Sequence, residues 1–176
     1  MPVHYVGIDV ARATLDMCVL PSKQTAHVPN TPAGRQKIIQ TLRSLAPNPG
    51  DIRVVFESTG GYELPTALAL EEVGFEVAII KPERARYFAK ANGQLAKTDT
   101  IDAEILASFC QLIPLTIVPL PPEELRHFRD LLDRREQLIE MRTMESNRRD
   151  TTLQKQARKS IDKHITWIDR ELGGIE

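Results

Sequence analysis

The start of the chain shows the alternation of apolar and polar positions that predicts β-strands. In residues 3–10, Val6, Ile8 and Val10 share one side of the predicted strand, and the other side carries Tyr5, Gly7 and Asp9. Residues 15–20 and 25–28 predict two further strands, the first broken by Pro21 and the second ended by Pro29. The chain therefore opens with a predicted three-stranded antiparallel meander.

Beyond the meander, predicted helices alternate with predicted strands. Thr31 followed by Pro32 is a helix-start signal, and Gly74 is well placed to end a later helix. The predicted elements are a helix over 32–45, a strand over 52–57, a helix to 73, a strand over 75–80 and, after a polar segment rich in Arg and Lys at 81–97, a helix that ends near 114. This order predicts an α/β fold, a mixed five-stranded sheet with flanking helices.

The pattern changes again after the prolines at 119–122, where we place a hinge. From residue 123 to about 171 the chain is charged, almost free of Gly and Pro, and helical in pattern. Its apolar positions, several of them seven residues apart, are Leu125, Phe128, Leu131, Leu132, Ile139 and, after an interruption at Ser146, Leu153. This spacing predicts a helical hairpin or a coiled-coil arm over 119–176, which follows a first domain over 1–118.

Two acids at the start of the last helix of the first domain are the first candidate functional residues. Three residues advance a helix by nearly one turn, so Asp99 and Asp102 share a face. The same face continues through Leu106, Phe109 and Ile113, which predicts that the acids point inward. Inward carboxylates need a cation, a donor or a proton to offset their burial. Capping of the helix start is the alternative reading.

Two further acids are predicted to lie near them. Asp9 sits in an apolar first strand, and Glu57 is the last residue of a central strand, the end at which functional crevices form in such sheets. Converging carboxylates are the hard oxygen ligands that Mg²⁺ requires, and two such ions clamp the attacking and leaving oxygens at phosphorus. Lys97 is placed to offset this charge or to contact a phosphate. The predicted chemistry is phosphodiester cleavage or strand transfer.

The overall charge of the chain does not decide whether it binds nucleic acid. Its net charge is −1, so only local clusters of cations carry information. The basic residues of the arm that could follow phosphates are Arg142, Arg148, Arg149, Lys155, Arg158 and Lys159, and a solvated helix surface is an equal alternative. Cys18 and Cys110 lack metal-binding spacing and are interpreted as buried residues of a cytoplasmic protein. No apolar stretch reaches membrane-spanning length.

Three separate motifs resemble one family. YVGIDVARATLD at 5–16, FESTGGYE at 56–63 and AKTDTIDAEILA at 96–107 are together similar to the DEDD-type insertion-sequence transposases and the related pilin-gene DNA invertases. The resemblance implies a RuvC-like, ribonuclease H-type domain in which Asp9, Glu57, Asp99 and Asp102 bind Mg²⁺ as catalytic residues, with Mn²⁺ as a substitute. It also implies a coiled-coil segment, DNA as substrate and a structured guide RNA. We expect a dimer or tetramer formed through the arm.

The chain departs from the family pattern at its end. The resemblance implies a further C-terminal domain with a nucleophilic serine, and no serine among these 176 residues matches that position. We therefore expect an N-terminal catalytic portion of a Mg²⁺-dependent transposase or recombinase, able to bind Mg²⁺ but not necessarily to recombine DNA alone.

Three other functions are compatible with parts of the sequence. A Holliday-junction-resolving endonuclease would use a related fold and the same acids. An actin-like sugar kinase also opens with a GIDV-like strand, but its phosphate loop needs small residues, and Arg12 stands in the corresponding turn. A non-catalytic nucleic-acid-binding assembly module would rely on the basic arm alone.

Overall fold

The computed structural model describes residues 4–93 and 99–175, and the side chains of residues 99–101 lie outside that description. The chain divides into two units, Met1–Leu120 and Pro121–Glu176. The elements of the first unit are β1 (His4–Val10), β2 (Thr14–Leu20), β3 (Gln24–Pro29), α1 (Pro32–Leu45), a short 3₁₀ turn (Pro49–Asp51), β4 (Ile52–Glu57), α2 (Leu64–Glu72), β5 (Glu76–Ile80), α3 (Pro82–Ala91) and α4 (Asp99–Leu112). The second unit consists of α5 (Glu123–Thr151) and α6 (Lys155–Gly173).

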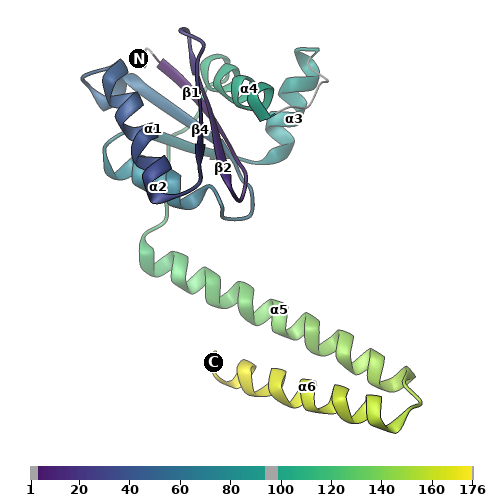
Figure 1. The fold of residues 1–176 in the computed structure, drawn as a ribbon. Helices are drawn as coiled ribbons and strands as arrows, with labels where there is room; N and C mark the ends of the chain where they lie inside the picture. Colours follow the sequence, from purple (N-terminus) through teal and green to yellow (C-terminus); the bar gives the residue numbers. More distant parts are fainter. Residues whose placement is uncertain (1–3, 94–98, 176) are drawn as a thin grey trace. The chain divides into compact units, whose positions relative to one another are not determined.

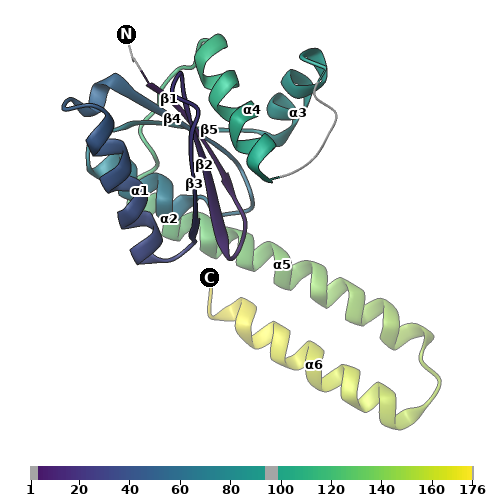
Figure 2. The same cartoon turned by 45° about the horizontal axis from the view of Figure 1, so that its top comes forward.

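The five strands form one mixed sheet in the order β3-β2-β1-β4-β5. The first three strands are an antiparallel meander, and β4 and β5 join β1 in parallel through helical crossovers. Helices α1 and α2 cover one face of this sheet, and α3 and α4 cover the other (Figures 1 and 2). The predicted α/β class and mixed five-stranded sheet are confirmed, and the arrangement is consistent with a ribonuclease H-like domain.

Each face of the sheet carries its own apolar cluster. Strand residues such as Val6, Ile8 and Phe56 pack with α1 and α2 in the larger cluster. On the opposite face, Leu106 and Phe109 of α4 pack on β4 and β5, so the inward stripe predicted for this helix is confirmed. The second face is the one that organises the candidate site, because the odd-numbered residues of β1 point toward α4.

The sequence pattern missed one helix. Within the polar segment at 81–97 the structure has α3, which begins at Pro82 and buries little besides Ala85. Phe88 packs edge-to-face on Phe109 with ring centroids 5.3 Å apart, and Arg84 lies over the same ring. A charged segment with so few apolar positions has no clear helical stripe, and its helix is stabilised by contacts with α4.

The arm is a helical hairpin, and one part of its predicted heptad pattern is wrong. Leu153 lies in the connection between α5 and α6 and is 95% exposed, so it does not continue the seam. The buried apolar contacts between the two helices use Leu138 and Ile168 instead. The predicted seam residues Leu125 and Ile139 stay exposed, and a coiled coil remains a prediction. None of the described helices is long and apolar enough to cross a bilayer.

Candidate metal and nucleic-acid site

Asp9 and Glu57 lie next to each other at the ends of two parallel strands. The register of β1 with β4 pairs Ile8 with Phe56, and the next residue on each strand is one of the two acids. Residues that pair in a parallel ladder point to the same face, here the face covered by α4. Both acids are half-buried. The pairing of β1 with β4 therefore places two of the four predicted acids at neighbouring backbone positions.

Helix α4 runs antiparallel to β1 and β4, so its first turn points toward that same edge. Gly7 in the middle of β1 packs against Ala103 and Ala107, whereas Cys110 donates an Sγ–H···O hydrogen bond to the Arg53 carbonyl at the start of β4 (3.7 Å). Following α4 back from Ala103 leads toward the carboxyl ends of the strands. The first residues of this helix therefore lie at the same end of the sheet as Asp9 and Glu57.

The two helix acids are only partly described. Asp102 directly precedes Ala103 and is half-buried. Asp99 is the first residue of α4, and its side chain, like Lys97 as a whole, lies outside the described residues. Carboxylates in the first turn of a helix are favoured by the partial positive charge of its N-terminus. The metal-binding role of all four acids remains a prediction.

The described side chains do not by themselves form a finished metal cage. Among the residues that the structure describes, no group of three or more His, Cys, Asp and Glu side chains could hold a metal ion. Mg²⁺ does not require such a cage, because it keeps several waters and needs only one or two carboxylates when phosphate oxygens complete its shell. Asp9 and Glu57 offer hard oxygen donors on neighbouring strands and thus fit that requirement.

A contact between a buried acid and an exposed histidine lies beside Asp9, and the sequence assigned it no role. Asp16 is the cross-strand partner of Asp9 on β2, and His27 is the partner of Asp16 on β3. Asp16 is 8% exposed, and its Oδ1 lies 2.8 Å from Nδ1 of His27. Because cross-strand partners share a face, this pair extends the row of Asp9 and Glu57. In the sequence, Asp16 is visible as the acid of RATLD. It is not distinguished from an ordinary strand residue until the pairing of β2 with β1 is known.

The loop after Glu57 is organised by a second buried acid. The Glu63 carboxylate accepts hydrogen bonds from the backbone N–H groups of Thr59 (3.1 Å) and Gly61 (3.0 Å) and from the Thr59 hydroxyl (2.8 Å). Burial alone would raise the pKa of Glu63, but these hydrogen bonds outweigh it and hold the pKa below the ordinary value. This explains the second acid of the FESTGGYE motif as a residue that fixes the turn.

A surface ion pair connects α4 to the turn between β2 and β3. Lys23, in the turn between β2 and β3, lies 3.0 Å from the Glu104 carboxylate of α4. The hydrogen bond with Glu104 raises the pKa of Lys23. Both side chains are well exposed, so the pair contributes little stability. It links α4 to the turn between β2 and β3, whereas the packing of Gly7 on α4 sets the position of the helix.

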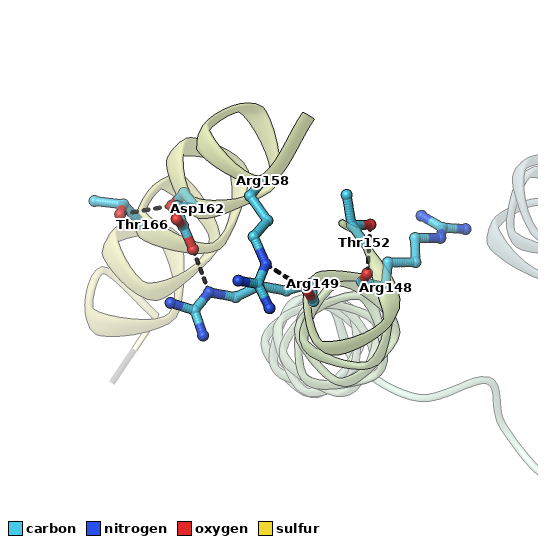
Figure 3. A network of polar contacts seen from close by, with 6 residues as sticks. All are labelled: Arg148, Arg149, Thr152, Arg158, Asp162 and Thr166. Carbon is cyan, nitrogen blue, oxygen red and sulfur yellow. Dashed lines mark hydrogen bonds and ion pairs between the residues drawn. The ribbon is translucent and has the colours of Figure 1, made fainter. Parts of the chain in front are cut away.

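Several of the cations predicted to follow phosphates in the arm are paired within the hairpin. Figure 3 shows Arg149 paired with Asp162, and Arg158 donating to the Arg149 carbonyl at 3.3 Å. Two further ion pairs join Arg142 to Asp169 (2.6 Å) and Arg148 to Glu145 (2.7 Å). Lys155 and Lys159 are exposed and take part in none of these pairs. Nucleic-acid binding by the arm therefore stays a prediction, best tested at these two lysines.

Comparison with known proteins identifies a matching family and two relatives of part of the chain. A model of a transposase family, the DEDD transposases of the IS110 type, matches residues 6–156. The pilin gene-inverting proteins of Moraxella bovis and Moraxella lacunata are each 28% identical over 111 residues. Those residues are 62% of this chain and 34% of each relative, so the chain spans about a third of the relatives it matches.

Proposed function

This chain belongs to the DEDD transposase family, and on that premise we propose that it is the N-terminal catalytic portion of an enzyme that cleaves and transfers DNA strands with the help of Mg²⁺. The observation that supports the proposal most directly is the register that carries Asp9 and Glu57 to adjacent ends of β1 and β4. The pilin gene-inverting proteins are named for a DNA rearrangement, which agrees with a recombinase.

In the proposed site, Asp9 and Glu57 would hold Mg²⁺ together with Asp99 and Asp102 of α4. Mn²⁺ should substitute, since it also prefers oxygen ligands. When bound, the ion supplies Lewis acidity at a phosphoryl oxygen. The chain itself contributes rigid placement: parallel strands fix the backbone of Asp9 and Glu57, and the close contact of Gly7 with Ala103 fixes the helix backbone next to Asp102.

Metal titration tests this proposal without requiring activity. Mg²⁺ or Mn²⁺ should raise the melting temperature of the wild-type chain and should not raise that of the double variant Asp9→Asn with Asp102→Asn. Asp133→Asn, an exposed acid on α5, is the matched control and should respond like the wild type. A wild-type chain that shows no shift, or an acid variant that shifts equally, contradicts the proposed site.

We also propose that the arm contacts nucleic acid, including the guide RNA that the family resemblance implies. The exposed cations Lys155 and Lys159 near the start of α6 are the support for this proposal. Reversing both to Glu should weaken RNA binding and reduce its dependence on salt. The matched control reverses Lys37 and Arg43, exposed on α1. Equal RNA affinity in both double variants would contradict RNA binding by the arm.

The arm is finally proposed to bring copies of the chain together. Leu125, Leu132 and Ile139 recur every seven residues and are 43%, 48% and 40% exposed. Such a stripe is typical of a helix that packs on a partner helix. Sedimentation of wild type and Leu132→Asp should show a dimer or tetramer that the variant loses. A wild-type chain that remains monomeric at high concentration would contradict self-association through this stripe.

A further inference from the structure

The loops that follow β1 and β4 are tied together at the carboxyl ends of these strands, next to Asp9 and Glu57. Asn30, just after β3, donates from Nδ2 to the carbonyl of Ala11 (3.1 Å) and to the carbonyl of Tyr62 (3.4 Å). One side chain thereby joins the turn at 11–13 to the loop at 58–63. The two loops form a continuous rim beside the proposed metal ligands.

The loop at 58–63 is rigid on one side and open on the other. On its buried side, the loop backbone is held by the Glu63 carboxylate, which accepts hydrogen bonds from the N–H groups of Thr59 and Gly61. Gly60 and Gly61 have φ values of 75° and 106°, and a Cβ added to either would meet nothing within 4 Å. The glycines thus meet the conformational demand of the turn while leaving its outer backbone uncovered.

Two side chains project from this rim without a structural task of their own. Arg12 is exposed, and no hydrogen bond or ion pair among the described residues involves its guanidinium. Tyr62 is 47% exposed although its backbone carbonyl is held by Asn30. Neither side chain contributes to the apolar clusters of the sheet. Their chemistry is complementary: a permanently charged guanidinium suits a phosphate, and an aromatic face suits a nucleobase.

We propose that Arg12 and Tyr62 hold a nucleic-acid strand on the rim, with Arg12 on a phosphate and Tyr62 stacked on a base, and lead that strand to Asp9 and Glu57. The proposal rests on the proposed function, since it names how the DNA strand is positioned there. Arg12 is three residues beyond Asp9, so the two lie within about 10 Å along the chain. At this separation, Arg12 and Asp9 can contact neighbouring nucleotides of the same bound nucleic-acid strand.

The first test measures stacking by Tyr62. Anisotropy of a labelled single-stranded DNA, with Ca²⁺ present to limit cleavage, should show about tenfold weaker binding by Tyr62→Ala and nearly unchanged binding by Tyr62→Phe. Tyr87→Ala removes another exposed tyrosine, 72% exposed on α3, and should bind like the wild type. Fluorescence of 2-aminopurine placed along the strand should be quenched by wild type and Tyr62→Phe, and not by Tyr62→Ala.

The second test measures the phosphate contact. Arg12→Ala should lower the slope of affinity against salt by about one, because one fewer phosphate is neutralised. Arg43→Ala, an exposed arginine on α1, should leave the slope unchanged. Both residues are exposed, so folding of the variants is expected and is checked by their melting temperatures. An RNA strand of the same sequence shows whether the rim distinguishes the two backbones.

The outcomes separate this inference from the proposed function. If the wild type binds Mg²⁺ and DNA but Tyr62→Ala and Arg12→Ala bind DNA normally, the rim is refuted and the metal site stands. If the wild type binds neither Mg²⁺ nor DNA, both fall together. If Tyr62→Phe binds as weakly as Tyr62→Ala, the stacking role is overturned, because the hydroxyl and not the ring would then make the contact.

Discussion

Gly7 of β1 lies directly against the backbone of Ala103 in α4. A Cβ added to Gly7 would stand 2.1 Å from the Ala103 carbonyl oxygen and 2.3 Å from the Ala107 nitrogen. Both distances are far shorter than any van der Waals contact, and both atoms belong to a helix backbone that cannot rotate away. The GIDV motif therefore combines a ligand candidate, Asp9, with the small residue that lets α4 approach the sheet.

Gly7→Ala should displace α4, and with it Asp102, relative to β1. We expect a loss of about 1–3 kcal/mol in the free energy of unfolding, the usual cost of overpacking, together with weaker Mg²⁺ binding. Urea unfolding and metal titration measure the two effects. Gly173→Ala is the matched control, because nothing lies within 4 Å of the added Cβ. A Gly7→Ala variant with wild-type stability would show that α4 does not need this close approach.

Glu63→Gln should destabilise the loop at 58–63. The neutral amide accepts the hydrogen bonds of Thr59 and Gly61 less strongly, and one of its groups is a donor, so we expect a loss of about 1–3 kcal/mol at neutral pH. Because the pKa of Glu63 is lowered by folding, its ionised form stabilises the protein above the ordinary value of 4.5. That contribution is lost as the pH falls through the lower pKa of the folded state.

Urea unfolding across this pH range tests the assignment. The difference in stability between the wild type and Glu63→Gln should be largest at neutral pH and should shrink on acidification below 4.5. Glu72→Gln at the end of α2 serves as the control for loss of one carboxylate. A pH-independent difference between Glu63→Gln and the wild type would mean that packing of the side chain, not its charge, fixes the turn.

Asp16→Asn should weaken Mg²⁺ binding about tenfold, although Asp16 is not one of the predicted ligands. Its carboxylate lies in the same cross-strand row as Asp9 and is held by His27 at 2.8 Å. Loss of this negative charge lowers the attraction for a cation at Asp9. Substitutions of residues that neighbour metal ligands commonly weaken metal binding in this way. Calorimetric titration measures the affinity. Asp51→Asn, in the 3₁₀ turn before β4, should leave the affinity unchanged, and equal affinities in both variants would exclude Asp16.

Leu138→Ala and Ile168→Ala should each destabilise the hairpin by about 2–5 kcal/mol, because both side chains are fully buried between α5 and α6. Leu132→Ala, exposed at 48%, should change the stability of a single copy by less than about 0.5 kcal/mol. Thermal unfolding followed by circular dichroism measures both. A Leu132→Ala effect that grows with protein concentration would place this residue in an interface between copies.

The sequence determined the strands and helices whose side chains repeat at a clear period. Strand β4 and helix α1 were predicted with the bounds that the structure has, because buried apolar runs and a Thr-Pro start signal are local properties. Asp9 and Glu57 were likewise recognisable as acids at special positions of their strands. Helix α3 was missed because it is stabilised by contacts with α4, which a local pattern does not reveal. Leu153 was misassigned because the chain turns between α5 and α6, and heptad spacing alone does not show that turn.

Tertiary structure alone decided which polar residues share an edge. The register of β1 with β2 and β4 aligns Asp16, Asp9 and the end of β4, and no spacing in the sequence specifies that alignment. The bridge from Asn30 to two separate loops, and the contact of Gly7 with Ala103, likewise join residues far apart in the chain. Local chemistry selects the elements, whereas the packing of α4 and the pairing of strands select which side chains meet.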